Sequence, residues 1–235
     1  MSKPQTPSII VFDVNETLLD LTTLEPFFES VFGDSSTMRE WFAQLIIYSQ
    51  ALTLSGLYTP FGELAAGTLR MVGETSGITI TEDNVAELKQ QIGKMPAHPD
   101  VAPALDKLKS AGFRLVTLTN SAPGPSPTPL ERAGLADYFE RSFSVHEVAR
   151  FKPASETYRS VAMELGVELS DLCMVACHLW DTIGAQTAGC AGALVRRPGN
   201  AAMFATGVPV PDIIGNDMNQ VSEQIITNWS TNIHS

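Results

Sequence analysis

The sequence predicts a doubly wound α/β fold, in which helices cover both faces of a parallel β-sheet and a helical segment is inserted after the first strand. Three observations support this fold class. The segment Ile9–Phe12 (IIVF) is a short β-branched and aromatic run, typical of a strand buried on both faces. Residues 24–95 carry helical spacing without a strand pattern, and from His98 onward helices and strands alternate.

The inserted segment is expected to form a helical cap over the edge where the strands end. In its second helix Trp41, Leu45 and Tyr48 fall on one face, and we expect this stripe to pack in the core. A cap in this position can exclude water from a site at the sheet edge. Four helices are predicted, near residues 24–32, 37–54, 60–76 and 82–92, with Gly33, Gly56 and Gly77 between them.

The rest of the chain is expected to complete the sheet. Gly112 is a natural end for the first helix of this part, and prolines stiffen the loop at residues 123–129. The predicted core domain comprises residues 1–20 and 98–235, and the predicted cap domain comprises residues 21–97. Strands are predicted at 113–118, 142–145, 172–177 and 192–195, and helices at 99–111, from Pro153 or Ser155, through Gly184 and Ala188, and at 219–228.

Polar side chains follow four predicted strands, at the edge of the sheet where ligands bind in this kind of fold. They are Asp13, Thr119 with Asn120, Lys152, and Asp181. A buried carboxylate is a good covalent nucleophile if a cation keeps it ionised, and Asp13 with Lys152 meets that requirement. Thr17, Thr119 and Asn120 can supply hydrogen bonds, and Asp181 can pair with Lys152 or orient water.

Each of these residues also has a structural interpretation. Asp13 and Thr17 would then be turn residues, Lys152 a solvated surface charge, and Asp181 the N-cap of the helix that follows it. Four such residues at four strand ends favour the catalytic interpretation.

The composition excludes several classes of partner. The formal net charge is -11 with a pI near 4.7, and no Lys/Arg-rich stretch occurs, which argues against nucleic acids and anionic membranes. A small anionic substrate would need a locally positive pocket. We find no apolar signal core or membrane-span pattern and expect a cytoplasmic protein. The odd number of cysteines suggests reduced thiols, and Cys177 with His178 lacks the second ligand pair of a metal site.

Four segments, FDVNETLLD, LVTLTNS, FKPASETY and VACHLWDTIGA, resemble the sequence motifs of the type II 2-haloacid dehalogenases in the haloacid dehalogenase (HAD) superfamily. The resemblance implies a Rossmann-like core with a cap, and a hydrolase that is usually a homodimer. It further implies that an aspartate displaces halide from the carbon next to a carboxylate in a short 2-haloalkanoic acid, after which water hydrolyses the aspartyl ester without a metal or other cofactor. The implied roles are Asp13 as nucleophile, Thr17 as its supporting hydroxyl, Thr119 and Asn120 as second-motif contacts, Lys152 as cation with Tyr158 as its partner, Asp181 as fourth-motif acid, and Trp180 as a substrate contact.

The first and fourth motifs depart from the family. Asn15 and Glu16 stand where these dehalogenases usually have an aromatic residue and glycine. Superfamily phosphatases have aspartate at the position of Asn15, and an amide cannot donate the proton that this acid supplies. The fourth motif offers only Asp181, where Mg2+-dependent members often have two acids. The alternative function, a Mg2+-dependent phosphatase or phosphonatase-like hydrolase, is therefore disfavoured.

The expected anion clamp is also altered. Phe42 occupies the position of an arginine that handles halide and carboxylate in the family, and Arg39, one helical turn earlier, is a candidate replacement. We count Asn15, Phe42 and Arg39 among the substrate-binding candidates. His178 is either a base or hydrogen-bond donor at the site, or a structural histidine bonded to a backbone carbonyl. These departures leave open a third function, a ligand-binding protein that keeps the fold without turnover.

Overall fold

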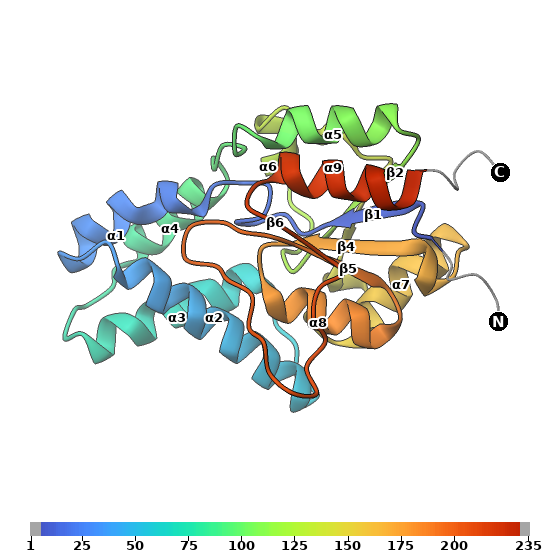
Figure 1. Ribbon diagram of the computed structural model, residues 1–235. Helices are drawn as coiled ribbons and strands as arrows, with labels where there is room; N and C mark the ends of the chain where they lie inside the picture. Colours follow the sequence, from blue (N-terminus) through green and yellow to red (C-terminus); the bar gives the residue numbers. More distant parts are fainter. Residues whose placement is uncertain (1–5, 231–235) are drawn as a thin grey trace.

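The computed structural model describes residues 6–230, which form a six-stranded sheet in the order β3-β2-β1-β4-β5-β6 (Figure 1). Every neighbouring pair of strands is parallel. The predicted fold class is therefore confirmed. The strands are β1 (Ile9–Phe12), β2 (Arg114–Thr119), β3 (Arg141–Ser144), β4 (Leu172–Ala176), β5 (Ala191–Val195) and β6 (Ile213–Gly215).

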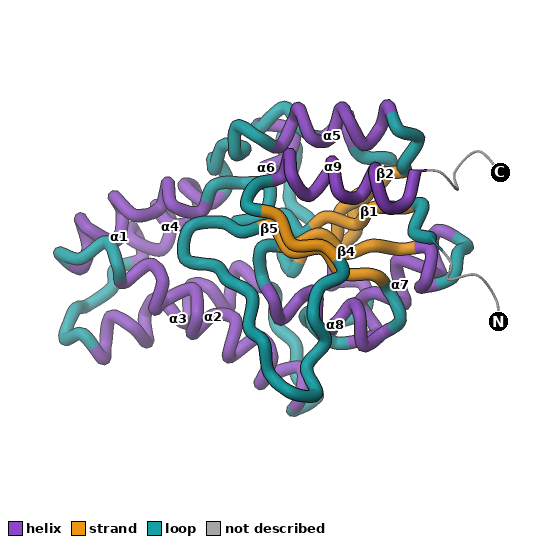
Figure 2. The backbone as a smooth tube through the Cα atoms, viewed as in Figure 1, coloured by secondary structure: helices purple, strands orange, loops and turns teal. Residues whose placement is uncertain are grey.

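Helices lie on both faces of the sheet, with α5 and α9 packed together on one face and α7 and α8 on the other (Figures 1 and 2). The helices α1–α4 gather beyond the carboxyl ends of the strands (Figure 1). The helices are α1 (Glu25–Phe32), α2 (Thr37–Leu54), α3 (Phe61–Thr75), α4 (Glu82–Ile92), α5 (Val101–Ser110), α6 (Pro129–Arg132), α7 (Ser155–Leu165), α8 (Leu179–Ala188) and α9 (Met218–Trp229).

The helical insertion α1–α4 matches the four helices expected from the sequence. Trp41 and Leu45 are buried as predicted, but Tyr48 is 42% exposed, so the prediction for Tyr48 was wrong. The buried face of α2 is centred between Leu45 and Phe42 instead of on Trp41, so Tyr48 lies at its edge. The buried residues are Met38, Trp41, Phe42, Leu45, Ile46 and Ser49. The division into a cap of residues 21–97 and a core stays a prediction.

Two short elements escaped the sequence analysis. The strand β6 has three residues (Ile213–Gly215) and follows a proline-rich loop, so no alternating pattern could develop. The helix α6 has four residues and starts with a capping box, in which Thr128 Oγ1 accepts a hydrogen bond from the Glu131 backbone N–H (3.3 Å). The Thr-Pro-Leu-Glu sequence of that box was a usable signal for a helix start.

A buried ion pair ties the loop after β1 to α9. The Arg197 Nη1 atom lies 2.8 Å from Asp100 Oδ2, and Arg197 Nη2 donates to the Thr17 carbonyl at 2.9 Å. Asp100 also accepts from the Met218 N–H at the start of α9 (2.7 Å). Burial alone would raise the pKa of Asp100, but the Arg197 and Met218 hydrogen bonds lower it. This pair fixes the loop on which Thr17 lies.

We expect Arg197→Met to lower the free energy of unfolding by about 2 kcal/mol, because it leaves the partly buried Asp100 carboxylate without its cation. The variant and the wild type should show their full difference in the free energy of unfolding at neutral pH. This difference should shrink as the pH falls below the ordinary carboxyl range, because the folded-state pKa of Asp100 is lowered and its stabilising effect is lost on protonation. Urea unfolding of both chains across this pH range measures it.

Arg70→Met is the matched control, because Arg70 forms an exposed pair with Glu82 (2.7 Å). It should change stability little at any of these pH values. Equal losses in the two variants would show that the Arg197 pair has no special role in the fold.

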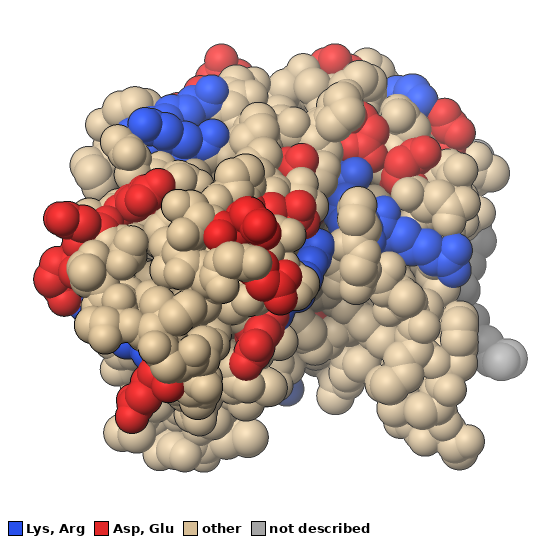
Figure 3. Space-filling model, turned by 90° about the vertical axis from the view of Figure 1, so that its left-hand side faces the viewer, with Lys and Arg blue, Asp and Glu red and all other residues tan. Residues whose placement is uncertain are grey.

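Side chains of both charges are mixed on the face that carries α1–α4. Figure 3 shows basic side chains there in separate groups among acidic and uncharged ones. Within residues 6–230, no helix is both long enough and apolar enough to cross a bilayer.

Candidate active site

Three side chains from different strand ends meet below the helical insertion. The Lys152 Nζ atom lies 2.8 Å from Asp13 Oδ1 and 2.6 Å from Asp181 Oδ2, and it donates to the Leu118 carbonyl at 2.9 Å. Lys152 has no exposed surface, so its interpretation as a solvated charge was wrong. The arrangement is a buried cation between two carboxylates.

The sheet order explains why these residues meet. Strand β1 lies between β2 and β4, so the loops after these three strands open side by side at one edge. Lys152 reaches this edge from the loop after β3, and Asn120 Oδ1 holds that loop by accepting from the Lys152 backbone N–H (3.1 Å). Asn120 is thus a positioning contact for Lys152, while the Thr119 hydroxyl accepts from the Ser121 N–H (3.1 Å).

The Asp13 carboxylate is 5% exposed and is held on both oxygens. Thr17 Oγ1 donates to Oδ2 at 2.6 Å and accepts from the Cys177 N–H at 3.0 Å. Burial alone would raise the pKa of Asp13, but Lys152, and then His178, hold this pKa well below its usual value. Thr17 does lie in the turn at residues 16–18, as its structural interpretation held, but its hydroxyl also bonds to the Asp13 carboxylate. The Asp13 side chain bonds to Thr17 and Lys152, so its interpretation as a turn cap was wrong.

Asp181 lies inside the first turn of α8, three residues after the N-cap residue His178, so the N-cap interpretation of Asp181 was wrong. Its carboxylate points to Lys152 and accepts from the Tyr158 hydroxyl at 2.6 Å. Tyr158 is therefore the partner of Asp181, not of Lys152 as expected. Burial raises the pKa of Asp181, and the nearby Asp13 charge adds to this effect against the attraction of Lys152.

The loop that carries Lys152 packs on α8 at Gly184, where no side chain fits. A Cβ atom at Gly184 would lie 2.4 Å from Pro153 Cβ and 2.8 Å from the Tyr158 hydroxyl. We expect Gly184→Ala to cost about 1–3 kcal/mol of stability by overpacking, and to lower activity by displacing Lys152 and Asp181. Thermal unfolding measures the loss of stability, and an enzyme assay measures the loss of activity.

Gly67→Ala in α3 is the matched control, since a Cβ there meets no atom within 4 Å. Alanine favours a helix over glycine, so this change should be neutral or stabilising. A Gly184→Ala chain that behaves in the same way would contradict the assigned packing.

A small pocket opens onto Asp13. Phe42 takes part in an aromatic stack at its wall, since the His178 ring lies 5.4 Å from the Phe42 ring and 5.0 Å from the Trp180 ring, at 16° to the latter. A larger apolar chamber of about 530 Å³ adjoins it under α2, α3 and α4 and shares the residues Asn15, Phe42 and Phe61. The small pocket is lined by Asp13, Asn15, Phe42, Ile46, Phe61, Thr119, Asn120, His178 and Trp180.

His178 is bonded to a carboxylate instead of a backbone carbonyl, so the structural interpretation of His178 named the wrong partner. Its Nε2 atom lies 2.7 Å from Glu16 Oε2, and its Nδ1 atom lies 3.3 Å from Asp13 Oδ2. Burial alone would lower the pKa of His178, but Cys177, Asp13 and Glu16 raise it well above its usual value. Burial also raises the pKa of the Cys177 thiol, which is therefore neutral near pH 7, so the two carboxylates supply the negative charge.

Glu16 is the site residue that the sequence analysis missed. Its side chain is buried, and it binds Arg39 Nη1 in addition to His178. Arg39 Nη2 also donates to the Pro198 carbonyl at 2.7 Å. Arg39 therefore does not line the pocket at Asp13, and the hypothesis that it replaces the missing anion clamp was wrong. Asn15 does line that pocket, and its amide donates to Ser121 Oγ at 3.3 Å.

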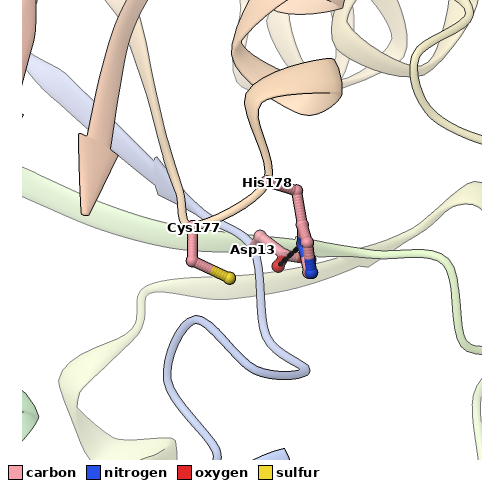
Figure 4. Close-up of side chains that lie close together, drawn as sticks. All are labelled: Asp13, Cys177 and His178. Carbon is pink, nitrogen blue, oxygen red and sulfur yellow. Dashed lines mark ion pairs between the residues drawn. The ribbon is translucent and has the colours of Figure 1, made fainter. Parts of the chain in front are cut away.

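Asp13, Cys177 and His178 have ligand atoms within 4.8 Å of one another (Figure 4), which is the spacing of a metal site. Their donor set fits a metal poorly. Mg2+ requires oxygen ligands, and only one of these three residues offers them. Lys152 and Thr17 already occupy the Asp13 oxygens, and the buried thiol of Cys177 is not ionised. Among residues 6–230 we therefore assign no metal centre.

The chain is similar to known proteins in both sequence and fold. The family model of the haloacid dehalogenase-like hydrolases matches residues 7–189. The chain is 29% identical to (S)-2-haloacid dehalogenase 1 of Pseudomonas sp. (strain CBS-3) over 76% of its length and 80% of that protein. It is also 29% identical to the (S)-2-haloacid dehalogenase of Xanthobacter autotrophicus, over 80% of this chain and 74% of that one.

Solved structures give the same picture of the fold. The L-2-haloacid dehalogenase of Xanthobacter autotrophicus superposes with a TM-score of 0.84 at 24% identity, covering 94% of this chain and 98% of that chain. The same enzyme has been solved with chloropropionic acid covalently bound, with the same TM-score of 0.84 and 24% identity over the same shares of the two chains.

Proposed function

We propose that this chain, which belongs to the haloacid dehalogenase-like hydrolase family, hydrolyses 2-haloalkanoic acids through a covalent ester on Asp13. The observation that carries the proposal is the buried, ionised Asp13 carboxylate, paired at 2.8 Å with Lys152 and facing a small pocket. A carboxylate kept anionic in this way is a nucleophile that needs no general base. The names of the relatives, all 2-haloacid dehalogenases, support the choice of substrate class.

In the first step, a carboxylate oxygen of Asp13 attacks the carbon that bears the halogen. The new bond is the ester C–O bond, and the carbon–halogen bond breaks with its electron pair leaving on the halide. Thr17 and Lys152 hold the carboxylate in one orientation, which reduces the entropy that must be lost in the transition state. Water then hydrolyses the ester, releases the 2-hydroxy acid and restores Asp13.

The substrate carboxylate must be recognised without the arginine that Phe42 replaces. The Asn120 side-chain oxygen is used by the Lys152 N–H, which leaves the Asn120 amide N–H groups as donors at the pocket. Asn15, Thr119 and the His178 ring line the same pocket. We propose that these groups, with Phe42 and Trp180 as apolar walls, bind the reacting end of short 2-haloalkanoic acids. The pocket at Asp13 holds only about 10 Å³, so the rest of the substrate would lie in the adjoining chamber of about 530 Å³.

The reaction is proposed to need no metal or other cofactor, as the donor set around Asp13 suggests. The phosphatase alternative has less support, because Asn15 is an amide and its side chain bonds to Ser121.

We also propose a homodimer in the cytoplasm, with residues 21–97 as the cap domain. Exposed apolar residues in the second half of α2, Ile47 and Leu54, offer a surface for a second copy.

The proposal is tested by halide release from chloroacetate and racemic 2-chloropropionate in the presence of EDTA. Multiple turnovers that depend on Asp13 are expected. Phosphate release from a panel of phosphate esters, dependent on added Mg2+ and without halide release, would replace this proposal with the phosphatase. Binding of the haloacid without any product would replace it with the ligand-binding protein.

A further inference from the structure

The loop after β1 carries an unusual residue next to the nucleophile. Glu16 has a φ of +67°, in the left-handed region that favours glycine, and its side chain is 3% exposed. Both features are unfavourable for a glutamate, because its Cβ is strained there and its charge is desolvated. Surrounding contacts must compensate for both. Strain of this kind next to a reacting group is a reason to look for a functional role.

The contacts of Glu16 form a closed network. Its carboxylate binds His178 Nε2 at 2.7 Å, Asn200 Nδ2 at 2.9 Å and the Arg39 guanidinium. Its backbone carbonyl accepts from His98 Nε2 at 3.0 Å. These partners come from the loop before α8, the loop after β5, α2 and the segment before α5. Glu16 is therefore fixed by contacts from four segments, and one of its carboxylate oxygens, Oε2, is bonded to His178.

His178 is oriented by the same network. Its ring is stacked on Trp180 and packed against Phe42, which prevents it from turning. Because a carboxylate can only accept, the Nε2 atom facing Glu16 carries hydrogen. The other ring nitrogen, Nδ1, lies 3.3 Å from Asp13 Oδ2, is buried, and has no well-aligned hydrogen-bond partner. Figure 4 shows the His178 ring directed at the Asp13 carboxylate.

We propose that Glu16 and His178 form a proton relay, in which Glu16 positions the ring and His178 Nδ1 accepts the proton of the water that hydrolyses the Asp13 ester. This inference rests on the proposed function and assigns the base of its second step. His178 is a catalytic residue in this scheme because Nδ1 faces the reacting carboxylate. Glu16 acts through His178 and is a positioning residue.

The charge changes at Asp13 set the timing of the relay. Before reaction, the carboxylates of Asp13 and Glu16 both face His178 and keep it protonated. Ester formation removes the Asp13 charge, while Lys152 remains cationic and Cys177 neutral, so the Nδ1 proton is released to solvent as the counterpart of the halide. Arg39 partly neutralises the remaining Glu16 charge and so weakens the attraction between Glu16 and the Nδ1 proton of His178.

The second step then balances. Water attacks the ester carbonyl carbon of Asp13 and its first proton goes to Nδ1. The tetrahedral intermediate collapses by breaking the bond to the product oxygen, which leaves as the alcohol with the remaining water proton. Asp13 returns to its carboxylate form beside a protonated His178, which is the starting state. The overall products are the 2-hydroxy acid, halide and one proton.

His178→Gln is the first test, because glutamine keeps polarity but cannot take up the proton. With chloroacetate we expect a burst of one halide per chain and then steady-state turnover at least about 100-fold slower than the wild type. Intact-protein mass spectrometry should find the carboxymethyl ester accumulated on the variant. Turnover within a few-fold of the wild type, or slow turnover without accumulated ester, would overturn the proposal.

His146→Gln is the matched control, since His146 contacts Tyr58 and does not line the pocket at Asp13. It should release halide at the wild-type rate without accumulating ester. A burst in this control would show that the assay reports a general effect of losing a histidine.

Glu16→Gln and Arg39→Gln test the positioning role through changes of opposite sign. The acid limb of the kcat–pH profile reports the base in the ester form of the enzyme. Loss of the Glu16 charge should move this limb to lower pH, and loss of the Arg39 charge should move it to higher pH. A merely structural role would lower kcat without moving the limb, and two unmoved limbs would overturn the relay.

A measurement without substrate separates the two proposals. The ¹⁵N resonances of His178 should titrate at lower pH in Glu16→Gln than in the wild type, whether or not either chain releases halide. If the wild type releases no halide, the proposed function fails and this titration alone decides the pairing. Identical titration of His178 in the two chains would overturn the role of Glu16.

Discussion

Asp13→Asn is expected to abolish halide release, with a loss of roughly four orders of magnitude or more in kcat. The amide has no anionic oxygen to displace the halide, and it also removes one of the two carboxylates that face Lys152. No ester should form, so mass spectrometry of the variant after incubation with chloroacetate should find the unmodified chain. Halide release by ion chromatography in EDTA gives the rate.

The fold should survive this change, because Lys152 keeps Asp181 as a counter-charge and Thr17 can still donate to the amide oxygen. An unfolding midpoint close to that of the wild type would confirm that the loss is chemical. Asp106→Asn, the same substitution on the exposed face of α5, should leave halide release unchanged. Ester formation or near-normal turnover in Asp13→Asn would exclude Asp13 as the nucleophile.

The elements that position Asp13 could be predicted because their signals are local. The runs in β1 and β4 are continuous apolar strands, as a sheet covered on both faces requires, and all residues of both strands are buried. The order of a parallel sheet brings strand ends to one edge, so the meeting of Asp13, Lys152 and Asp181 followed from topology before any side chain was placed.

The polar partners could not be predicted in the same way, because they depend on side-chain directions between distant segments. Glu16 and His178 are 162 positions apart, and nothing in either segment specifies their pairing. Arg39 lies on the expected face of α2, but the buried Glu16 carboxylate binds its guanidinium before it can reach the pocket. Tyr158 was expected to be the partner of Lys152, yet its hydroxyl donates to Asp181, because a protonated lysine offers no acceptor.

Lys152→Met is expected to have the second large effect, on both activity and stability. Methionine keeps much of the side-chain volume but removes the cation from between Asp13 and Asp181. Asp181 is then buried without a counter-charge and Asp13 keeps only His178, so we expect a loss of about 3–5 kcal/mol in the free energy of unfolding. Halide release should fall with it, because Lys152 would no longer help to hold Asp13 ionised and oriented.

The pH dependence gives this prediction a definite sign. In the wild type Lys152 and His178 hold the pKa of Asp13 below its usual value against the effect of burial. Burial and the Asp13 charge already raise the pKa of Asp181 against the attraction of Lys152, so both pKa values should rise when Lys152 is removed. A carboxyl group whose folded-state pKa is raised is most stable when protonated. The stability deficit of Lys152→Met should therefore be largest at neutral pH and shrink as the pH falls through the raised pKa values. Urea unfolding of both chains from neutral to acidic pH measures it.

Lys152→Met/Asp181→Asn is the decisive comparison, because the second change removes the carboxylate that Lys152→Met leaves without a counter-charge, while the Tyr158 hydroxyl can still donate to the amide oxygen. The double variant should regain part of the stability lost in Lys152→Met but none of the halide release. That separation would show that the cation holds the fold through both carboxylates and the chemistry through Asp13. A double variant no more stable than the single one would mean that lost packing, rather than charge, accounts for the effect of removing Lys152.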